Sequence, residues 1–359
     1  MGTATMQAAV YRGEGRVEVE TVGVPTLGRG EVLVKVGACG VCGTDLKKIH
    51  YGLVPPPRIF GHETAGTLVA LGPEVTGWRV GDRVAVNHHV PCLSSDCFFC
   101  RRRAFSQCPV YKKTGTTAGF EPAGGGFAEY VRVMDWCVER GMVRLPEHVT
   151  FEEASFIEPL NTCLKGVRMA DVKEGDTVLV IGQGPIGLLF TQLARLAGAH
   201  VVATDLHDYR LEVARELGAQ VALKPKPEEV RSAVRTLSEG RGADLAIVAV
   251  PSTVVVADAF AVLRPAGRVL LFAQTRLDDP LTVDAGAICM QEKALLGSYS
   301  SDITLQDEAA ELIFSRRIRV APLITHRFPL NSIADALEIA SHPRDKSLKI
   351  LVTSEAASL

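Results

Sequence analysis

Residue types that bind metal ions stand in two short glycine-rich segments near the start of the chain, GACGVCGTD (37–45) and FGHETAG (60–66). Cys42, His62 and Glu63 supply a thiolate, an imidazole and a carboxylate. Three protein ligands that leave a fourth position open are typical of a catalytic zinc ion, which acts as a Lewis acid on its substrate. Spacing alone leaves the alternative that each residue is structural, as a core histidine, a surface carboxylate and a buried thiol.

Four further cysteines, Cys92, Cys97, Cys100 and Cys108, stand within 17 residues. Four thiolates in one loop suit a closed, tetrahedral structural zinc site. The alternatives are core thiols, or a redox pair formed by Cys97 and Cys100. Arg101–Arg103 stand directly after Cys100, which raises the remote alternative of a non-enzymatic, zinc-dependent nucleic-acid-binding protein. The whole chain carries 39 Lys and Arg against 41 Asp and Glu, so we expect no nucleic-acid partner and interpret the arginines as a solvated loop.

The segment VLVIGQGPIG places Gly182, Gly184 and Gly187 in a G-x-G-x-x-G pattern, with Pro185 and Ile186 between the last two glycines. The pattern follows an apolar run typical of a buried strand and begins an amphipathic run typical of a helix, which is the context of a dinucleotide-binding turn. Such glycines allow a tight bend and the close approach of a pyrophosphate to the helix N-terminus. A strand-to-helix turn without a ligand is the alternative.

The cofactor expected at this turn is NAD. Asp205 ends the next predicted strand, 18 residues after Gly187, where a carboxylate can accept hydrogen bonds from both ribose hydroxyls and repel a 2′-phosphate. A helix N-cap is the alternative role for Asp205. Arg210 leaves NADP open, because an arginine here can contact a 2′-phosphate, although it could equally cover the adenine ring.

The elements that must position these residues divide the chain into two parts. At roughly 150 residues per domain, 359 residues suggest about two domains. The first 150 residues favour β-strands separated by Gly- and Pro-rich turns, with strands at 16–20 and 31–36. Later in the chain strands alternate with helices, which predicts parallel βαβ units in a doubly wound sheet. Its strands are expected at 177–182, 200–205, 243–250 and 267–273.

The composition favours a cytoplasmic protein. The nine cysteines are an odd number in a long chain, and the N-terminal residues contain no apolar signal core. A reducing compartment with metal-bound thiolates therefore fits better than a disulfide scaffold. The most apolar stretch, 177–194, is interrupted by glycines, a proline and two glutamines, so we expect no membrane association through a spanning helix.

The whole chain resembles a zinc-dependent medium-chain alcohol dehydrogenase. GHETAGTLVALGPEVTGWRVGDRVAV is similar to the GHE signature of that superfamily and to the glycine-rich turns after it. CGTD, GGFAEYV and VLVIGQGPIG occur in the same order as in the family. FIEPLNTCLKG, which contains Glu158, is similar to the sorbitol (iditol) and polyol dehydrogenase branch, whereas the ethanol-type branch has a cysteine zinc ligand in this region.

The resemblance implies a role for each residue near the first cluster. Glu158 would be an alternative zinc ligand or would hold the zinc-bound water, and both arrangements stay open. Thr44 matches the family's relay hydroxyl, which takes the proton of the substrate alcohol. Asp45 would orient the ligand histidine through the other ring nitrogen. The implied ligands of the catalytic zinc are Cys42, His62 and Glu63.

Two positions depart from the family pattern. The family's structural zinc loop has two residues between its first two cysteines, whereas four residues separate Cys92 from Cys97 here. We expect Cys92 to remain the first ligand, because Ser94 at the regular position is a poor zinc ligand. Lys47 stands where many relatives carry a relay histidine, and His50 is the candidate substitute.

The resemblance also implies an α/β architecture, with a GroES-like, β-rich catalytic domain and a Rossmann-type, doubly wound parallel sheet domain. The catalytic domain is expected at 1–158 and 298–359, and the dinucleotide-binding domain at 159–297. The implied activity is the reversible oxidation of a secondary hydroxyl of a polyol or sugar-related alcohol to a ketone, with NAD, one catalytic zinc and one structural zinc. L-Threonine, another amino alcohol or a simple secondary alcohol are the alternative substrates. We expect a homotetramer or homodimer.

Overall fold

The computed structural model describes residues 4–114, 124–273, 275, 279–344 and 346–353. The chain divides into two compact units. The first is made of Met1–Pro159, Ser301–Arg316 and Val320–Leu359, and the second of Leu160–Ser300 and Arg317–Arg319. One helix, α6 (Ile157–Met169), begins in the first unit and continues into the second.

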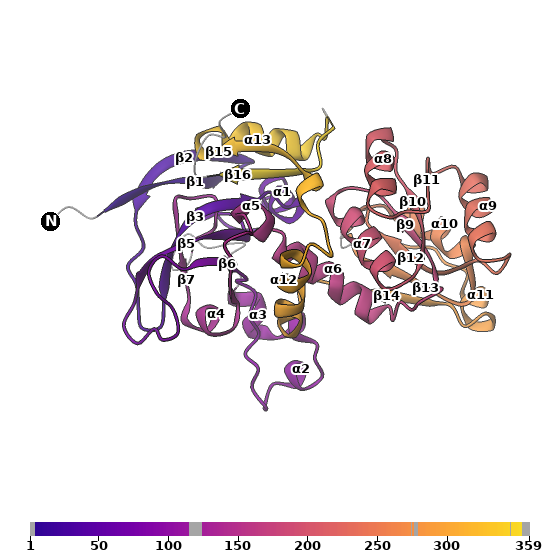
Figure 1. Cartoon of the computed structure of the whole chain (residues 1–359), viewed down its shortest axis with the longest axis horizontal. Helices are drawn as coiled ribbons and strands as arrows, with labels where there is room; N and C mark the ends of the chain where they lie inside the picture. The colour runs from indigo at the N-terminus through magenta and orange to yellow at the C-terminus, as the bar shows by residue number, and fades with distance from the viewer. Residues whose placement is uncertain (1–3, 115–123, 274, 276–278, 345, 354–359) are drawn as a thin grey trace. The chain divides into compact units, whose positions relative to one another are not determined.

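The first unit is built from a seven-stranded sheet and a three-stranded sheet. The larger sheet has the order β15-β16-β3-β5-β6-β8, with β7 paired to β3 off this path, and the smaller has the order β2-β1-β4. The last strands of the chain, β15 and β16, thus complete a sheet that β3 begins (Figure 1). The strands are β1 (Thr5–Gly13), β2 (Arg16–Gly23), β3 (Val32–Gly40), β4 (Arg58–Ile59), β5 (Glu63–Leu71), β6 (Arg83–Val86), β7 (Tyr130–Val133), β8 (Met142–Arg144), β15 (Ile324–Pro329) and β16 (Lys349–Thr353).

Short helices connect these strands. They are α1 (Gly43–His50), α2 (Phe98–Arg101), α3 (Pro109–Thr114), α4 (Asp135–Arg140), α5 (Phe151–Ala154), α12 (Gln306–Phe314) and α13 (Ile333–Ser341). Single 3-10 turns are η1 (Phe105–Gln107), η2 (Ile303–Leu305), η3 (Ala321–Leu323) and η4 (Leu330–Ser332).

Three strand ends meet at one edge of the larger sheet. β3 runs antiparallel to β5, with Gly40 opposite Glu63, and antiparallel to β16, with Gly40 opposite Leu351. The carboxyl end of β3 therefore lies beside the first residues of β5 and of β16. Side chains that follow β3, precede β5 or begin β16 are brought together although the sequence separates them widely.

The second unit is a six-stranded sheet in which every pairing is parallel, with the order β11-β10-β9-β12-β13-β14. All residues of β9 and β12 are buried, as expected for the centre of a sheet covered by helices. The predicted βαβ alternation is thus confirmed. The strands are β9 (Thr177–Ile181), β10 (His200–Thr204), β11 (Val221–Leu223), β12 (Ala243–Val248), β13 (Leu263–Leu271) and β14 (Ala294–Gly297), and the helices are α7 (Pro185–Leu196), α8 (Asp208–Glu216), α9 (Pro227–Leu237), α10 (Val254–Val262) and α11 (Ala285–Met290).

One strand of the second unit begins earlier than its pattern predicts. β13 starts at Leu263 rather than at residue 267, because Leu263 pairs with Ala243 across an irregular register that precedes the regular pairing from Arg268 onward. No helix within the described ranges is long and apolar enough to cross a membrane.

Candidate active site and metal-binding clusters

Cys42, His62 and Glu63 come together at the carboxyl end of β3. Cys42 is the N-cap of α1, two residues beyond β3, while His62 directly precedes β5 and Glu63 begins it. One sulfur, one imidazole nitrogen and one carboxylate oxygen from these residues lie within 4.8 Å of one another. The three side chains are therefore close enough for a single ion to contact all of them.

Asp45 connects two members of this cluster. Its Oδ1 lies 3.2 Å from Nδ1 of His62, and its Oδ2 accepts a hydrogen bond of 3.2 Å from the backbone N–H of Cys42. Because Nδ1 of His62 faces Asp45, Nε2 is the nitrogen left for a metal. Burial disfavours the charged form of His62, but the interactions with Asp45 and Cys42 outweigh this effect and raise the pKa of His62 well above its usual range.

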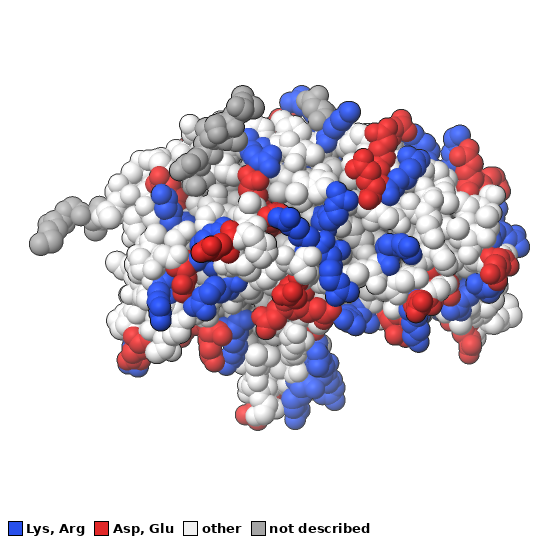
Figure 2. Space-filling model, viewed as in Figure 1, with Lys and Arg blue, Asp and Glu red and all other residues white. Residues whose placement is uncertain are grey.

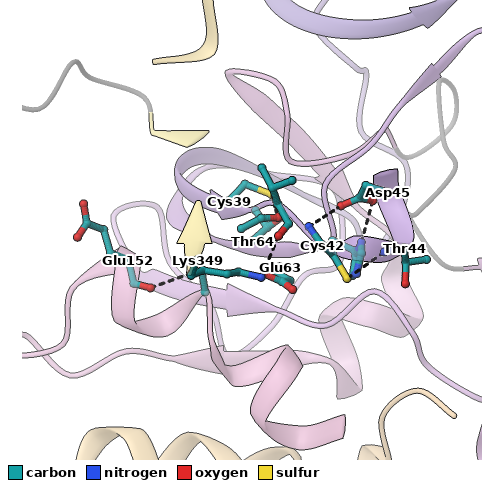
Figure 3. Close-up of polar contacts among 12 residues, drawn as sticks. Cys39, Cys42, Thr44, Asp45, Glu63, Thr64, Glu152 and Lys349 are labelled. Carbon is teal, nitrogen blue, oxygen red and sulfur yellow. Dashed lines mark hydrogen bonds and ion pairs between the residues drawn. The ribbon is translucent and has the colours of Figure 1, made fainter. Parts of the chain in front are cut away.

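Sequence reasoning missed Lys349, the first residue of β16. The side chain is buried, and its Nζ forms an ion pair with Oε2 of Glu63 (Figure 3). Nζ also donates a hydrogen bond of 3.1 Å to the carbonyl of Val41. Desolvation disfavours the ammonium, but Glu63 and Cys42 raise the pKa of Lys349. A Cβ on Gly40 would collide with the Glu63 carboxylate, so the pair also needs this glycine. No motif marks Lys349, and only the β3–β16 register brings it here.

Glu158 lies near the same cluster, in the first turn of α6, but outside the group of three within 4.8 Å. Burial raises the pKa of Glu158 to about 7, an effect that Glu63 reinforces and that His62 and Lys349 oppose. The structure thus brings Glu63 to Cys42 and His62, and leaves Glu158 as a second buried carboxylate beside them.

The remaining residues predicted near this cluster lie on α1. Thr44 is half-buried, and its backbone N–H donates a hydrogen bond of 3.4 Å to Sγ of Cys42. Lys47 is half-buried, and burial lowers its pKa. His50 is exposed and packs edge to face against Tyr51, with ring centroids 4.8 Å apart. His50 therefore lies on the surface rather than inside the cluster.

The four clustered cysteines form a second group, whose sulfurs all lie within 4.8 Å of one another. Sγ of Cys92 is 3.7 Å from that of Cys100 and 3.6 Å from that of Cys108. Desolvation opposes a thiolate at Cys108, but hydrogen bonds from backbone groups outweigh it and lower the pKa of Cys108 to about 6. A lowered pKa favours the thiolate form that binds metals. All nine cysteines lie in the described residues and are free thiols.

The longer interval after Cys92 closes as a compact turn. Leu93 adopts a left-handed conformation with φ +52°. The carbonyl of Ser94 accepts a hydrogen bond of 3.1 Å from the N–H of Cys97, and its hydroxyl accepts one of 3.1 Å from the N–H of Asp96. The hydroxyl of Ser94 is thus used inside the turn, and Cys92 is the residue that reaches the other sulfurs.

The glycine pattern of the second unit forms the tight turn between β9 and α7. Gly182 has φ +90°, and a Cβ on Gly187 would collide with the carbonyl oxygen of Gly182. Gly184 is the N-cap of α7, Pro185 occupies its first turn, and no side chain caps the helix. Ile186 follows within the same turn. The free N–H groups at this helix N-terminus can receive a phosphate.

Asp205 directly follows β10 and contacts the same turn. Its Oδ2 accepts a hydrogen bond of 2.7 Å from the backbone N–H of Gln183, and its Oδ1 accepts one of 2.9 Å from the N–H of His207. The N-cap of α8 is His207, so the alternative that Asp205 caps this helix is wrong. Nη1 of Arg210 lies 3.7 Å from Oδ2 of Asp205, which places the predicted acidic and basic residues side by side.

Two family models match this chain: the alcohol dehydrogenase GroES-like domain over residues 28–147 and the zinc-binding dehydrogenase domain over residues 185–315. The sorbitol dehydrogenase of Bombyx mori is 32% identical over 357 residues, which cover 96% of this chain and 97% of that protein. The chain belongs to the zinc-dependent medium-chain alcohol dehydrogenase superfamily. The L-threonine 3-dehydrogenase of Symbiobacterium thermophilum is also 32% identical, over 330 residues that cover 89% of this chain and 90% of that protein.

A solved structure agrees with this assignment. A zinc-binding dehydrogenase from Sinorhizobium meliloti 1021, bound to NADP, matches with a TM-score of 0.88 and 28% identity, covering 98% of this chain and 100% of that chain. The dehydrogenase is therefore an α/β enzyme with a GroES-like part and a Rossmann-type parallel sheet. The predicted fold class and the sorbitol dehydrogenase-like branch are confirmed.

Two histidines of the dehydrogenase that sequence reasoning did not single out lie beside His62. His88 and His89 follow β6, and the ring of His89 meets that of His62 edge to face at 5.9 Å between centroids. Burial lowers the pKa of His88 to about 3 and that of His89 well below its usual range, which favours the neutral form of both rings.

The cluster of four cysteines in the dehydrogenase predicts that loss of one of its thiols lowers the zinc content. We expect two zinc ions per chain in the wild type and one in Cys92→Ser, because a hydroxyl cannot replace the thiolate that closes the group. Ser94→Ala is the matched control and should retain both ions. Zinc is measured by elemental analysis of the dialysed protein. Two ions in Cys92→Ser would contradict a role for Cys92 as a ligand.

The buried ion pair of the dehydrogenase predicts a large loss of stability. In the metal-free protein, Lys349→Met should lower the free energy of unfolding by about 3–5 kcal/mol, because it leaves the Glu63 carboxylate buried without its paired ammonium group. Lys173→Met, which breaks an exposed pair with Asp171, should cost less than about 1 kcal/mol. Both are measured by urea unfolding. Equal effects of the two substitutions would show that Lys349 is not required to hold the carboxylate.

Proposed function

We propose that this dehydrogenase reversibly oxidises a secondary hydroxyl of a polyol or sugar-related alcohol to a ketone with NAD. The observation that carries the proposal is the cluster of Cys42, His62 and Glu63, with Glu158 as a second buried carboxylate beside it. The sorbitol dehydrogenase of Bombyx mori, 32% identical along nearly the whole chain, supports the substrate class.

A zinc ion would be held by Sγ of Cys42, Nε2 of His62 and one oxygen of Glu63. This donor set fits zinc, because thiolate, imidazole and carboxylate are its ordinary ligands and three of them leave room for a substrate. When bound, the ion supplies a Lewis acid that lowers the pKa of the substrate hydroxyl. Asp45 keeps Nε2 of His62 turned toward the ion. Lys349 holds the other oxygen of Glu63 and compensates its charge.

Thr44 and Glu158 are not ligands of the resting zinc ion in this proposal. They would instead handle the proton of the substrate and a water molecule. The hydroxyl of Thr44, two residues after Cys42, would accept the proton that the substrate hydroxyl releases and would pass its own proton on toward the cofactor ribose and solvent. Glu63 would be the resting third ligand, because it lies within the group of three and Glu158 does not. Glu158 would hold the water that the substrate displaces.

A second zinc ion would be structural. Cys92, Cys97, Cys100 and Cys108 would surround it with four sulfurs, which leaves no position for a substrate. Cys97 is the N-cap of the short helix α2, Cys100 lies within that helix and Cys108 ends the 3-10 turn η1, so the ion would hold these short elements together. Positive side chains gather in the part of the first unit where α2 lies (Figure 2), and they would lie near the negative charge of the four proposed thiolates.

NAD is the proposed cofactor. Asp205 lies beside the glycine turn with its carboxylate fixed by two backbone N–H groups, where it would accept hydrogen bonds from ribose hydroxyls and repel a 2′-phosphate. Arg210, 3.7 Å from Asp205, would be held by that carboxylate and would be less available to a 2′-phosphate. The Sinorhizobium meliloti structure, bound to NADP, makes this choice worth testing directly.

L-Threonine or a related amino alcohol is the second candidate substrate. The L-threonine 3-dehydrogenase of Symbiobacterium thermophilum is as similar in sequence as the Bombyx mori sorbitol dehydrogenase, which supports it. Initial rates with sorbitol, 2,3-butanediol, 2-butanol and L-threonine at saturating NAD discriminate the candidates. Turnover of L-threonine alone would overturn the polyol assignment.

In this proposal the catalytic domain is residues 1–158 and 298–359, and the cofactor domain is residues 159–297. The enzyme would act in the cytoplasm as a homodimer or homotetramer. The free state of all nine cysteines supports a reducing compartment.

Cys42→Ala tests the metal mechanism. We expect it to lose one zinc ion and to lower kcat by at least about a thousandfold, because the Lewis acid supplies several kcal/mol to the barrier. The exposed thiol of Cys289 gives a matched control, and Cys289→Ala should retain metal and turnover. Wild-type turnover in Cys42→Ala after loss of zinc would contradict the mechanism.

Asp205→Asn tests the cofactor. The wild type should prefer NAD, and the variant should shift the ratio of kcat/KM for NAD over NADP toward NADP by about ten- to a hundredfold, because charged hydrogen bonds to the ribose are lost. Asp208→Asn removes an exposed carboxylate nearby and should leave the ratio unchanged. A wild-type preference for NADP, or an unchanged ratio in Asp205→Asn, would contradict the assignment.

A further inference from the structure

Two adjacent imidazoles beside the proposed metal ligands have unsatisfied ring nitrogens. Nε2 of His88 and Nδ1 of His89 are both buried and have no hydrogen-bond partner within the described part of the chain. Buried polar atoms are nearly always paired, because an unpaired donor or acceptor has lost its hydrogen bonds to water. Two such atoms on consecutive residues next to a catalytic cluster indicate a binding role.

A backbone hydrogen bond and two ring contacts hold His89 in place. The N–H of His89 donates a hydrogen bond of 2.9 Å to Oδ1 of Asn87. The ring of His89 stacks on Tyr111, with centroids 5.4 Å apart and planes 28° apart, and its edge meets His62 at 5.9 Å and 79°. The ring is therefore positioned against the histidine whose Nε2 would bind the ion.

The polar side chains around His88 and His89 form hydrogen bonds with one another and not with the two unpaired nitrogens. Nδ2 of Asn87 lies 3.3 Å from Oγ of Ser301 and 3.1 Å from Oε1 of Gln306. The hydroxyl of Tyr111 lies 3.2 Å from Oγ of Ser301. This network does not use the two unpaired histidine nitrogens. If packing were the only role of these rings, phenylalanine could fill the same space without leaving buried nitrogens unpaired.

We propose that His88 and His89 recognise a second hydroxyl of the substrate, adjacent to the one that is oxidised, and so select diols and polyols over alcohols with a single hydroxyl. The inference rests on the proposed function and narrows its substrate class. Each ring has one unpaired nitrogen, which donates or accepts a hydrogen bond according to the tautomer of the ring, so the two nitrogens together can supply one donor and one acceptor to a hydroxyl. The ammonium group of an amino alcohol only donates, so it can use only a nitrogen that accepts.

The test compares two substrates that share one carbon skeleton, 2,3-butanediol and 2-butanol, with the zinc-loaded enzyme at saturating NAD. The measured quantity is the ratio of kcat/KM for the diol over the mono-alcohol. We expect a ratio above about ten in the wild type, and a fall of about tenfold in His89→Phe, which keeps the stacked ring but loses its nitrogens. In His89→Phe, kcat/KM for the diol should fall, whereas kcat/KM for 2-butanol should change by less than about threefold. His89→Asn, which restores a polar atom near the position of Nδ1, should recover part of the ratio.

His342→Phe is the matched control, because His342 is exposed on the end of α13 and the same substitution there should leave the ratio unchanged. A wild-type ratio near or below one overturns the inference without any variant. An equal loss on both substrates in His89→Phe also overturns it, since that result shows a structural role only. If the wild type oxidises neither alcohol nor any polyol, the proposed function itself fails.

Discussion

The pairing register of β3 with β5 is the constraint on which the proposed catalytic site depends. Gly40 stands opposite Glu63, so the cysteine just beyond β3 meets the histidine and glutamate at the start of β5. A slip of one residue would turn Glu63 to the other face of the sheet and separate the donors. The absence of a side chain at Gly40 leaves the space that the carboxylate occupies.

Charge compensation is the second requirement, because the register places several ionisable groups out of water. Asp45 and Glu63 are buried, and each has a nearby cation or imidazole: His62 beside Asp45, and Lys349 beside Glu63. Removing a partner from such a pair costs more than the pair contributes, since the remaining charge stays desolvated. Strand β16, from the far end of the chain, therefore completes the site electrostatically as well as completing the sheet.

Local patterns in the sequence located most of the candidate site and the parallel sheet. Short motifs marked Cys42, His62, the four clustered cysteines and the glycine turn. The spacing of residues within each of these segments is set by the local structure, so it could be recognised from the sequence. Lys349 could not be found in this way, because it approaches Glu63 and Val41 only through strand pairing over a separation of 308 residues from Val41. His88 and His89 are conspicuous only once their unpaired nitrogens and their contact with His62 are known. The N-cap alternative for Asp205 was wrong because His207 lies closer to the first turn of α8.

Zinc K-edge X-ray absorption tests most directly whether sulfur, nitrogen and oxygen atoms at the end of β3 bind one zinc ion. The measurement uses the Cys92→Ser variant, because only the proposed catalytic ion should remain in it. Coordination by Cys42, His62 and Glu63 predicts a first shell with one sulfur and several lighter nitrogen or oxygen scatterers. A first shell made mainly of sulfur, or one without sulfur, would contradict this coordination.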